Sequence, residues 1–149
     1  MAKSTKRNAS ASTKTTVRLP QSTDHKRIVW VYDKIDRSGK FAFDLNRIDF
    51  DHKEFLDKMI NYSNATWTDV KKQTHDNNKS KHHFIAFDEL SKDAQKRFES
   101  LKLEEYSDSI FSFAFRNKLR ILGIRENENF HVLWYDPNHE ACPSSKKNT

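Results

Sequence analysis

Residues 110–135 read IFSFAFRNKLRILGIRENENFHVLWY, and this stretch decides the fold. Phenylalanine occupies every second position near its start, a period of two that is typical of a strand with one buried face. Asn117 and the polar group 126–129 are short enough to be hairpin turns between strands. The stretch therefore predicts a three-stranded antiparallel meander, with strands at 110–116, 118–125 and 130–135.

The sequence before this meander carries helical signals. Three residues have the N-cap chemistry and spacing that open a helix: Asp51, Thr66 and Ser91. The segment 27–33 is β-branched and aromatic, which indicates a further strand. Helices before a meander predict an α+β domain, namely an antiparallel sheet with a C-terminal three-stranded meander and helices packed on one face. The strongest apolar stripe at helical spacing is Leu90, Ala94, Phe98 and Leu101.

The net charge of +6 comes from the N-terminal segment. Residues 1–27 hold 7 basic and 1 acidic side chains, whereas the other 122 residues hold 20 of each sign. Residues 1–25 are rich in Ser and Thr and poor in apolar side chains, which predicts a disordered basic tail. A nucleic-acid-binding arm and a solubilising extension both fit this tail, and the second is favoured. We expect one domain over 26–142 and a flexible C-terminal tail over 143–149.

Composition excludes several classes of protein. The longest apolar run, at 28–32, is too short to span a membrane, and residues 1–23 lack a signal-peptide core. We therefore expect a cytoplasmic protein with no membrane contact. The single Cys142 rules out an internal disulfide and a multi-cysteine zinc site. The chain has only 2 glycines and thus no Gly-rich phosphate loop, and we expect no metal or cofactor.

A concentrated positive stretch lies around the middle strand of the meander. Side chains alternate along a strand, so Lys118 and Arg120 are expected on the same surface of the sheet. Guanidinium and ammonium groups bind phosphate, which makes this surface a candidate phosphate site. Residues 116–125 carry four basic side chains and no acidic one, namely Arg116, Lys118, Arg120 and Arg125.

The end of the third strand brings a histidine towards that surface. Pro137 ends the strand because it has no N–H for the ladder, and His139 then lies just past the sheet edge. A histidine moves protons near neutral pH, and Trp134 and Tyr135 suit stacking on a base. Together with Arg120 these residues favour RNA cleavage that needs no metal ion. The same segment also suits an ordinary turn with a surface histidine.

The other histidines are weaker candidates. His131, in the third strand, is expected to be a partly buried, hydrogen-bonded side chain. His82 and His83 are adjacent, so on an extended segment they point to opposite sides and are poor co-ligands of a metal. His75 has no partner at a metal-ligand spacing.

Three segments resemble the end of the RelE/ParE-like toxins: 113–124, 130–134 and 136–139. The segment 90–95 is also similar to the helix that precedes the meander in that superfamily. The resemblance implies a compact toxin fold. RelE-type members are ribosome-dependent mRNA interferases, ParE-type members act on DNA gyrase, and both are normally silenced by an antitoxin protein.

By position in this resemblance, Arg120 contacts the scissile phosphate, and Lys118 and Arg116 are further phosphate contacts. His139 takes the place of the family's basic or aromatic residue after the last strand. We therefore expect a toxin that is an endoribonuclease, with RNA, free or ribosome-bound, and an antitoxin as partners. The alternative is a non-catalytic module that binds nucleic acid or a protein such as a topoisomerase, or an accessory factor.

Overall fold

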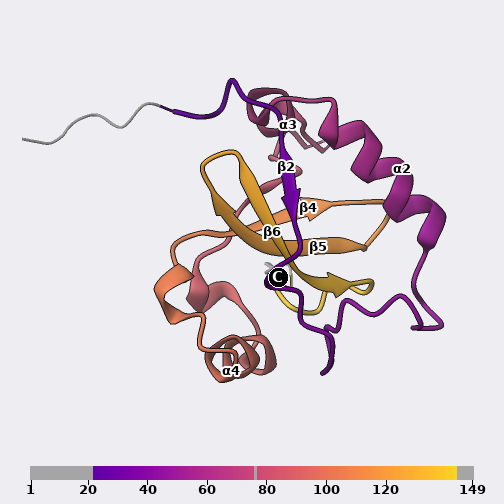
Figure 1. The fold of residues 1–149 in the computed structure, drawn as a ribbon, viewed down its shortest axis with the longest axis vertical. Helices are drawn as coiled ribbons and strands as arrows, with labels where there is room; N and C mark the ends of the chain where they lie inside the picture. Colours follow the sequence, from indigo (N-terminus) through magenta and orange to yellow (C-terminus); the bar gives the residue numbers. More distant parts are fainter. Residues whose placement is uncertain (1–21, 76, 144–149) are drawn as a thin grey trace, which may run out of the picture.

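A five-stranded sheet runs through the middle of the domain (Figure 1). The computed structural model describes residues 22–75 and 77–143. The strands follow one another across the sheet in the order β2-β6-β5-β4-β3. Their bounds are Val29–Val31 for β2, His83–Phe84 for β3, Ile110–Ala114 for β4, Arg120–Glu126 for β5 and Asn129–Asp136 for β6.

The three C-terminal strands are antiparallel neighbours, as the alternating sequence predicts. Ala114 pairs with Arg120 between β4 and β5, and Arg120 pairs with Asp136 between β5 and β6. The connecting turns contain Asn117 and Asn127, whose φ angles are 57° and 59°. Asparagine tolerates this left-handed conformation better than most residues. The predicted turn positions are therefore confirmed.

The first strand departs from the antiparallel pattern. β2 runs parallel to β6, with Val29 opposite Asn129 and Val31 opposite His131. The sheet is therefore mixed, and the prediction of an antiparallel sheet is wrong at this edge. A parallel pair needs a crossover connection, and all the other described elements lie between these two strands in the chain.

Three α-helices lie in the described residues, and each begins at a predicted cap. The side chains of Asp51 and Ser91 accept hydrogen bonds from the backbone N–H three residues on, at 2.9 and 3.1 Å. Thr66 forms a reciprocal capping box. The helices are α2 (His52–Ser63), α3 (Trp67–Lys72) and α4 (Lys92–Ser100), with 3₁₀ turns η2 (Phe87–Glu89) and η3 (Glu104–Tyr106).

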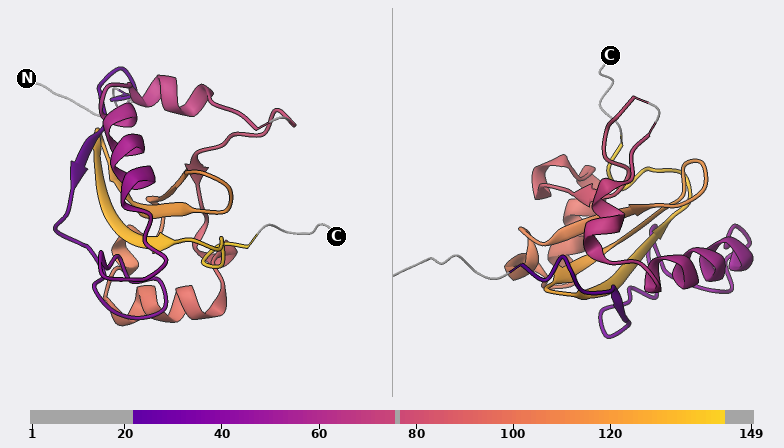
Figure 2. Two further views of the ribbon diagram at one scale, coloured as in Figure 1. Left: turned by 90° about the vertical axis from the view of Figure 1, so that its right-hand side faces the viewer. Right: turned by 90° about the horizontal axis from the view of Figure 1, so that it is seen from above.

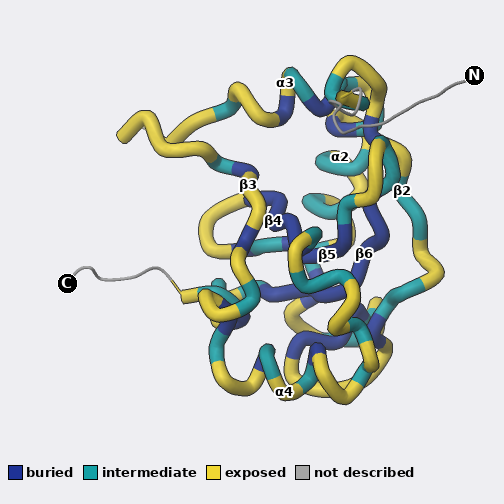
Figure 3. The backbone as a smooth tube through the Cα atoms, turned by 90° about the vertical axis from the view of Figure 1, so that its left-hand side faces the viewer, coloured by how far each residue is buried: buried dark blue, intermediate teal, exposed yellow. Residues whose placement is uncertain are grey.

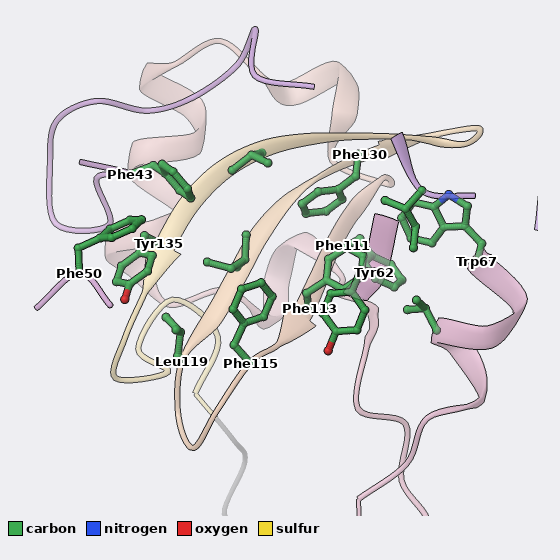
Figure 4. Close-up of a cluster of buried hydrophobic side chains, with 14 residues drawn as sticks. Phe43, Phe50, Tyr62, Trp67, Phe111, Phe113, Phe115, Leu119, Phe130 and Tyr135 are labelled. Carbon is green, nitrogen blue, oxygen red and sulfur yellow. The ribbon is translucent and has the colours of Figure 1, made fainter. Parts of the chain in front are cut away.

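Helices cover both faces of the sheet, because β5 and β6 present apolar side chains on both sides. One face packs on α2 and α3 through an aromatic cluster, most of which Figure 4 labels. The other face packs on α4, which Figure 1 shows across the sheet from α2 and α3. The prediction of helices on one face is therefore wrong. The first cluster includes Tyr62, Trp67, Phe111, Phe113 and Phe130, and the second includes Phe98, Leu122, Ile124 and Trp134.

Asp24 ties the beginning of the described chain to the domain. Its carboxylate oxygens lie 2.6 Å from Nη2 of Arg125 and 2.8 Å from Nζ of Lys71. Sequence analysis assigned Asp24 to the tail, but these ion pairs make it part of the folded domain. Of the predicted tails, residues 1–21 and 144–149 lie outside the described residues.

Burial is concentrated in the C-terminal strands (Figure 3). β4 is buried throughout, as is most of β5 and β6, whereas the loop between α3 and β3 is largely exposed. The meander therefore forms the centre of the domain. Within the part of the chain that the structure describes, no helix combines the length and apolar character needed to cross a membrane.

Candidate active site

Four strands bring polar side chains to one end of the sheet. There β4 ends at Ala114, β5 begins at Arg120 and β6 ends at Asp136, and these residues are cross-strand partners. The edge strand β3 lies beside them, because His83 pairs with Ser112 of β4. In the left view of Figure 2, the β4–β5 turn, β3 and the chain after β6 lie on the same side of the domain. Segments far apart in the sequence therefore meet here.

Arg120 is half-buried at this end and forms no ion pair with a described carboxylate. Its Nη1 donates hydrogen bonds to the carbonyl oxygens of Asn117 and Leu119, at 2.8 and 3.0 Å. Arg97 and Arg125 differ, because each binds an aspartate at 2.6 Å. Nε and Nη2 of Arg120 donate to no other described residue, so this guanidinium is available to a bound anion.

His139 lies on a turn that the side chain of Asp136 holds in place. The two carboxylate oxygens of Asp136 accept hydrogen bonds from the backbone N–H groups of Glu140 and Ala141, at 2.9 and 2.8 Å. The carbonyl of Ala141 accepts from the N–H of Ser91, which caps α4. The φ angle of His139 is 58°, a conformation that is uncommon outside glycine and is often found at functional sites. The fold therefore fixes the position of this histidine.

Burial, together with the charge nearby, keeps the imidazole of His139 neutral. Burial lowers the pKa of His139 to about 4, and nearby cationic groups act in the same direction. At pH 7 the ring is therefore neutral and able to accept a proton. An anion bound among these groups would offset their charge and make His139 a better proton acceptor. The cationic groups are Arg120 and Lys118, and the side chains of His83 and His75 also interact electrostatically with His139.

His82 supports this end of the sheet from the opposite face. The N–H of Ala114 donates to its Nδ1 at 3.0 Å, so Nδ1 carries no proton. Its Nε2 lies 2.8 Å from Oε1 of Gln73 and therefore carries the hydrogen. Burial lowers the pKa of His82 to about 3, and neighbouring positive charges add to this effect. His82 is thus a neutral structural residue.

We expect the free energy of unfolding to decrease as the pH falls from 6.5 towards 4. In the unfolded chain His82 takes up a proton near pH 6.5, but in the folded protein only near pH 3. The unfolded state therefore binds more protons than the folded state over this range, so the free energy of unfolding decreases as the pH falls. Chemical denaturation at pH 7 and pH 5 measures the change. The loss of unfolding free energy between pH 7 and pH 5 should be smaller for His82→Gln than for wild type. It should equal the wild-type loss for the exposed control His25→Gln. The same pH dependence in all three proteins would contradict this account.

The structure brings together three of the predicted site residues and separates a fourth. Lys118 and Arg120 are both close enough to His139 for their charges to lower its pKa. Arg116 instead ion-pairs with Asp51 at the start of α2, which covers the other face of the sheet. Its guanidinium is thus engaged away from the other three side chains.

Trp134 and Tyr135 are core residues and offer no surface for a base. Trp134 is 0% exposed and its Nε1 donates to a carboxylate oxygen of Asp36 at 2.9 Å. Tyr135 is 1% exposed and its hydroxyl donates to the carbonyl of Asp49 at 3.2 Å. The prediction that they stack on a base is therefore wrong. It assumed one open face of the sheet, whereas both faces are covered.

His83 was considered above only as a metal ligand, but the structure brings it close enough to His139 to interact with it electrostatically. The two residues are far apart in the sequence, and only the pairing of β3 with β4 brings them to the same end of the sheet. The alternation of His82 and His83 was a usable signal. It predicts one inward and one outward histidine, and the structure confirms that His82 is buried and His83 exposed.

His131 belongs to a separate polar cluster. Its Nδ1 lies 2.6 Å from Asp33 and its Nε2 3.2 Å from Glu126. It is 8% exposed, so it is hydrogen-bonded as predicted and more deeply buried than the partly buried side chain that was expected. Both ring nitrogens are engaged, so this residue is unsuited to proton transfer with a substrate.

Cys142 is not activated as a nucleophile, and the described residues include no cluster of metal ligands. Burial raises the pKa of the Cys142 thiol to about 11, so the thiol keeps its proton at neutral pH and is a poor nucleophile. Within residues 22–75 and 77–143, no group of three or more His, Cys, Asp or Glu side chains is placed to hold a metal ion. The chemistry of the site therefore rests on its arginine, lysine and histidines.

Comparison of the chain with known proteins found no relative. No protein-family model matches the chain, and no curated protein or solved structure matches it. The function is accordingly inferred from the geometry and charge of the site.

Proposed function

We propose that the protein is an endoribonuclease that cleaves RNA without a metal ion, with Arg120 and His139 at the reaction centre. One observation carries this proposal. A half-buried arginine that forms no salt bridge with a described residue, and feels the charge of Asp136 only at longer range, has its own charge close enough to His139 to lower the pKa of that histidine, which is neutral at pH 7. The arginine supplies a binding site for phosphate, and the histidine supplies a proton acceptor.

RNA provides its own nucleophile for this chemistry. His139 accepts the proton of a ribose 2′-hydroxyl, and the 2′-oxygen attacks the adjacent phosphorus. Arg120 and Lys118 stabilise the negative charge that develops on the phosphoryl oxygens. An acid then protonates the 5′-oxygen as it leaves. The product carries a 2′,3′-cyclic phosphate on one fragment and a 5′-hydroxyl on the other.

We further propose that this nuclease is a RelE-like toxin. The resemblance of 113–124, 130–134 and 136–139 to the end of that superfamily supports the assignment. It implies a cytoplasmic protein that an antitoxin silences, acting on RNA that is free or bound to the ribosome.

Controlled induction in a bacterium tests the proposal. Wild type should arrest growth and produce new RNA ends, which primer extension on abundant transcripts maps. Arg120→Ala and His139→Ala should each lose at least about 100-fold of the cleavage, since Arg120 stabilises the charge on the phosphoryl oxygens and His139 accepts the proton. Arg37→Ala is a matched control, because Arg37 is exposed and lies outside the site.

Other outcomes of this experiment count against the proposal. Arrest without new RNA ends would favour the second candidate, a non-catalytic module that binds nucleic acid or a gyrase-type protein target. The net positive charge of residues 1–27, which hold 7 basic side chains and 1 acidic side chain, supports that candidate. Cleavage that persists in both variants would reject this site, and the absence of arrest with folded wild-type protein would reject the toxin assignment.

A further inference from the structure

His83 has the orientation of a proton-transfer group. Its Nδ1 lies 3.0 Å from the carbonyl oxygen of Phe84, and because a carbonyl only accepts, Nδ1 carries the hydrogen. This hydrogen bond fixes the ring and leaves Nε2 as the nitrogen that can exchange a proton. His83 lies on the edge strand β3 and is exposed, so Nε2 is open to a ligand.

His83 shares a face of the sheet with Arg120. His83 pairs with Ser112, and Arg120 pairs with Ala114 two residues further along β4. Residues two apart on a strand point to the same side, so His83 and Arg120 do as well. His83 also lies close enough to His139 for the two side chains to interact electrostatically. Arg120, His83 and His139 therefore border one site.

We propose that His83 is the general acid of the cleavage, opposite the general base His139; this rests on the proposed ribonuclease function. His139 takes the 2′-hydroxyl proton as the bond between the 2′-oxygen and phosphorus forms. The bond between phosphorus and the 5′-oxygen breaks, and the 5′-oxygen receives the proton from Nε2 of the His83 imidazolium. One proton is taken up and one released, and exchange with water restores both histidines.

Other groups near the site are unsuited to this role. Both carboxylate oxygens of Asp136 accept backbone hydrogen bonds. Both ring nitrogens of His82 are engaged within the core. Arg120 does not release a proton in proteins. Lys118 is a rival for this role, because its charge also reaches His139, and the experiment includes it.

A change of leaving group tests His83 directly. Purified wild type and variants are given two RNA oligonucleotides, one natural and one in which sulfur replaces the bridging 5′-oxygen at the cleavage position. A thiolate leaves without protonation, because a thiol is a much stronger acid than an alcohol. His83→Gln should cleave the natural RNA at least about 100-fold more slowly than wild type, but the sulfur RNA within a few-fold of wild type. His139→Gln should be slow on both, and His25→Gln should match wild type on both.

The outcomes separate this inference from the function on which it rests. If His83→Gln slows both substrates equally, or neither, His83 is not the general acid. If Lys118→Gln shows the sulfur rescue and His83→Gln does not, the acid is Lys118 and the inference is overturned. If wild type cleaves neither substrate, the proposed function itself fails, and the assignment of His83 fails with it.

Discussion

Replacing Asp36 with alanine should lower the free energy of unfolding by about 2–3 kcal/mol, because it removes a buried, charged hydrogen-bond acceptor that pairs with the partly exposed Arg97. The side chain of Asp36 is 1% exposed. Its carboxylate accepts hydrogen bonds from Nε and Nη2 of Arg97, at 2.8 and 2.6 Å, and from Nε1 of Trp134 at 2.9 Å. Burial raises the pKa of Asp36, but these hydrogen bonds outweigh burial and the pKa is lowered. The carboxylate therefore joins α4, β6 and the loop before α2.

Chemical denaturation of Asp36→Ala and Asp93→Ala measures this effect. Asp93 is a matched control because it lies on α4, the helix that carries Arg97, and also forms an ion pair. Its side chain is 68% exposed and lies 3.5 Å from Nζ of Lys40. Such an exposed pair contributes at most about 1 kcal/mol. Equal losses of unfolding free energy in the two variants would show that Asp36 does not hold α4, β6 and the loop before α2 together.

Gly123→Ala should destabilise the protein by about 3 kcal/mol or more, because the sheet leaves no room for a side chain there. A Cβ at this position would lie 2.2 Å from the carbonyl oxygen of His131 and 2.6 Å from Cζ of Phe130. The first contact is with backbone, which cannot rotate away. The register between β5 and β6 also shifts between Leu122 and Gly123, so the irregular pairing depends on glycine.

Gly39→Ala provides the comparison for this prediction. Gly39 has φ 89°, which strains any other residue by about 1–3 kcal/mol. Its nearest obstacle, however, is Nε of the Arg97 side chain at 3.3 Å. Thermal and urea unfolding should therefore show a larger loss for Gly123→Ala than for Gly39→Ala, and the reverse order would contradict the close approach of β5 and β6.

The parts of the fold that depend on neighbouring residues were predictable. The caps at Asp51, Thr66 and Ser91 and the turns at Asn117 and Asn127 are local, and the structure confirms them. The parallel pairing of β2 with β6 was not predictable from local pattern, because its partner lies about 100 residues along the chain. Helices on both faces had a visible signal in the consecutive apolar residues of β5 and β6, which leave neither face polar.

The site divides in the same way. Lys118 lies in the turn between β4 and β5, Arg120 begins β5 and His139 follows β6, so their closeness along the meander, and not strand alternation, brings them together. Trp134 and Tyr135 have a chemistry that suits base stacking, but tertiary packing buries them. His83 reaches the site only through the pairing of β3 with β4. Residue type therefore predicted the role of a side chain only where tertiary packing left that side chain accessible.

The most direct test of the central claim is cleavage of a 5′-labelled RNA by purified protein in the presence of EDTA. Wild type should produce fragments that end in a 2′,3′-cyclic phosphate, and Arg120→Ala and His139→Ala should each be at least about 100-fold slower while remaining folded. This result would place the reaction at the end of the sheet where β4, β5 and β6 meet. Folded wild-type protein that leaves the RNA intact, or variants that cleave as fast as wild type, would contradict the account.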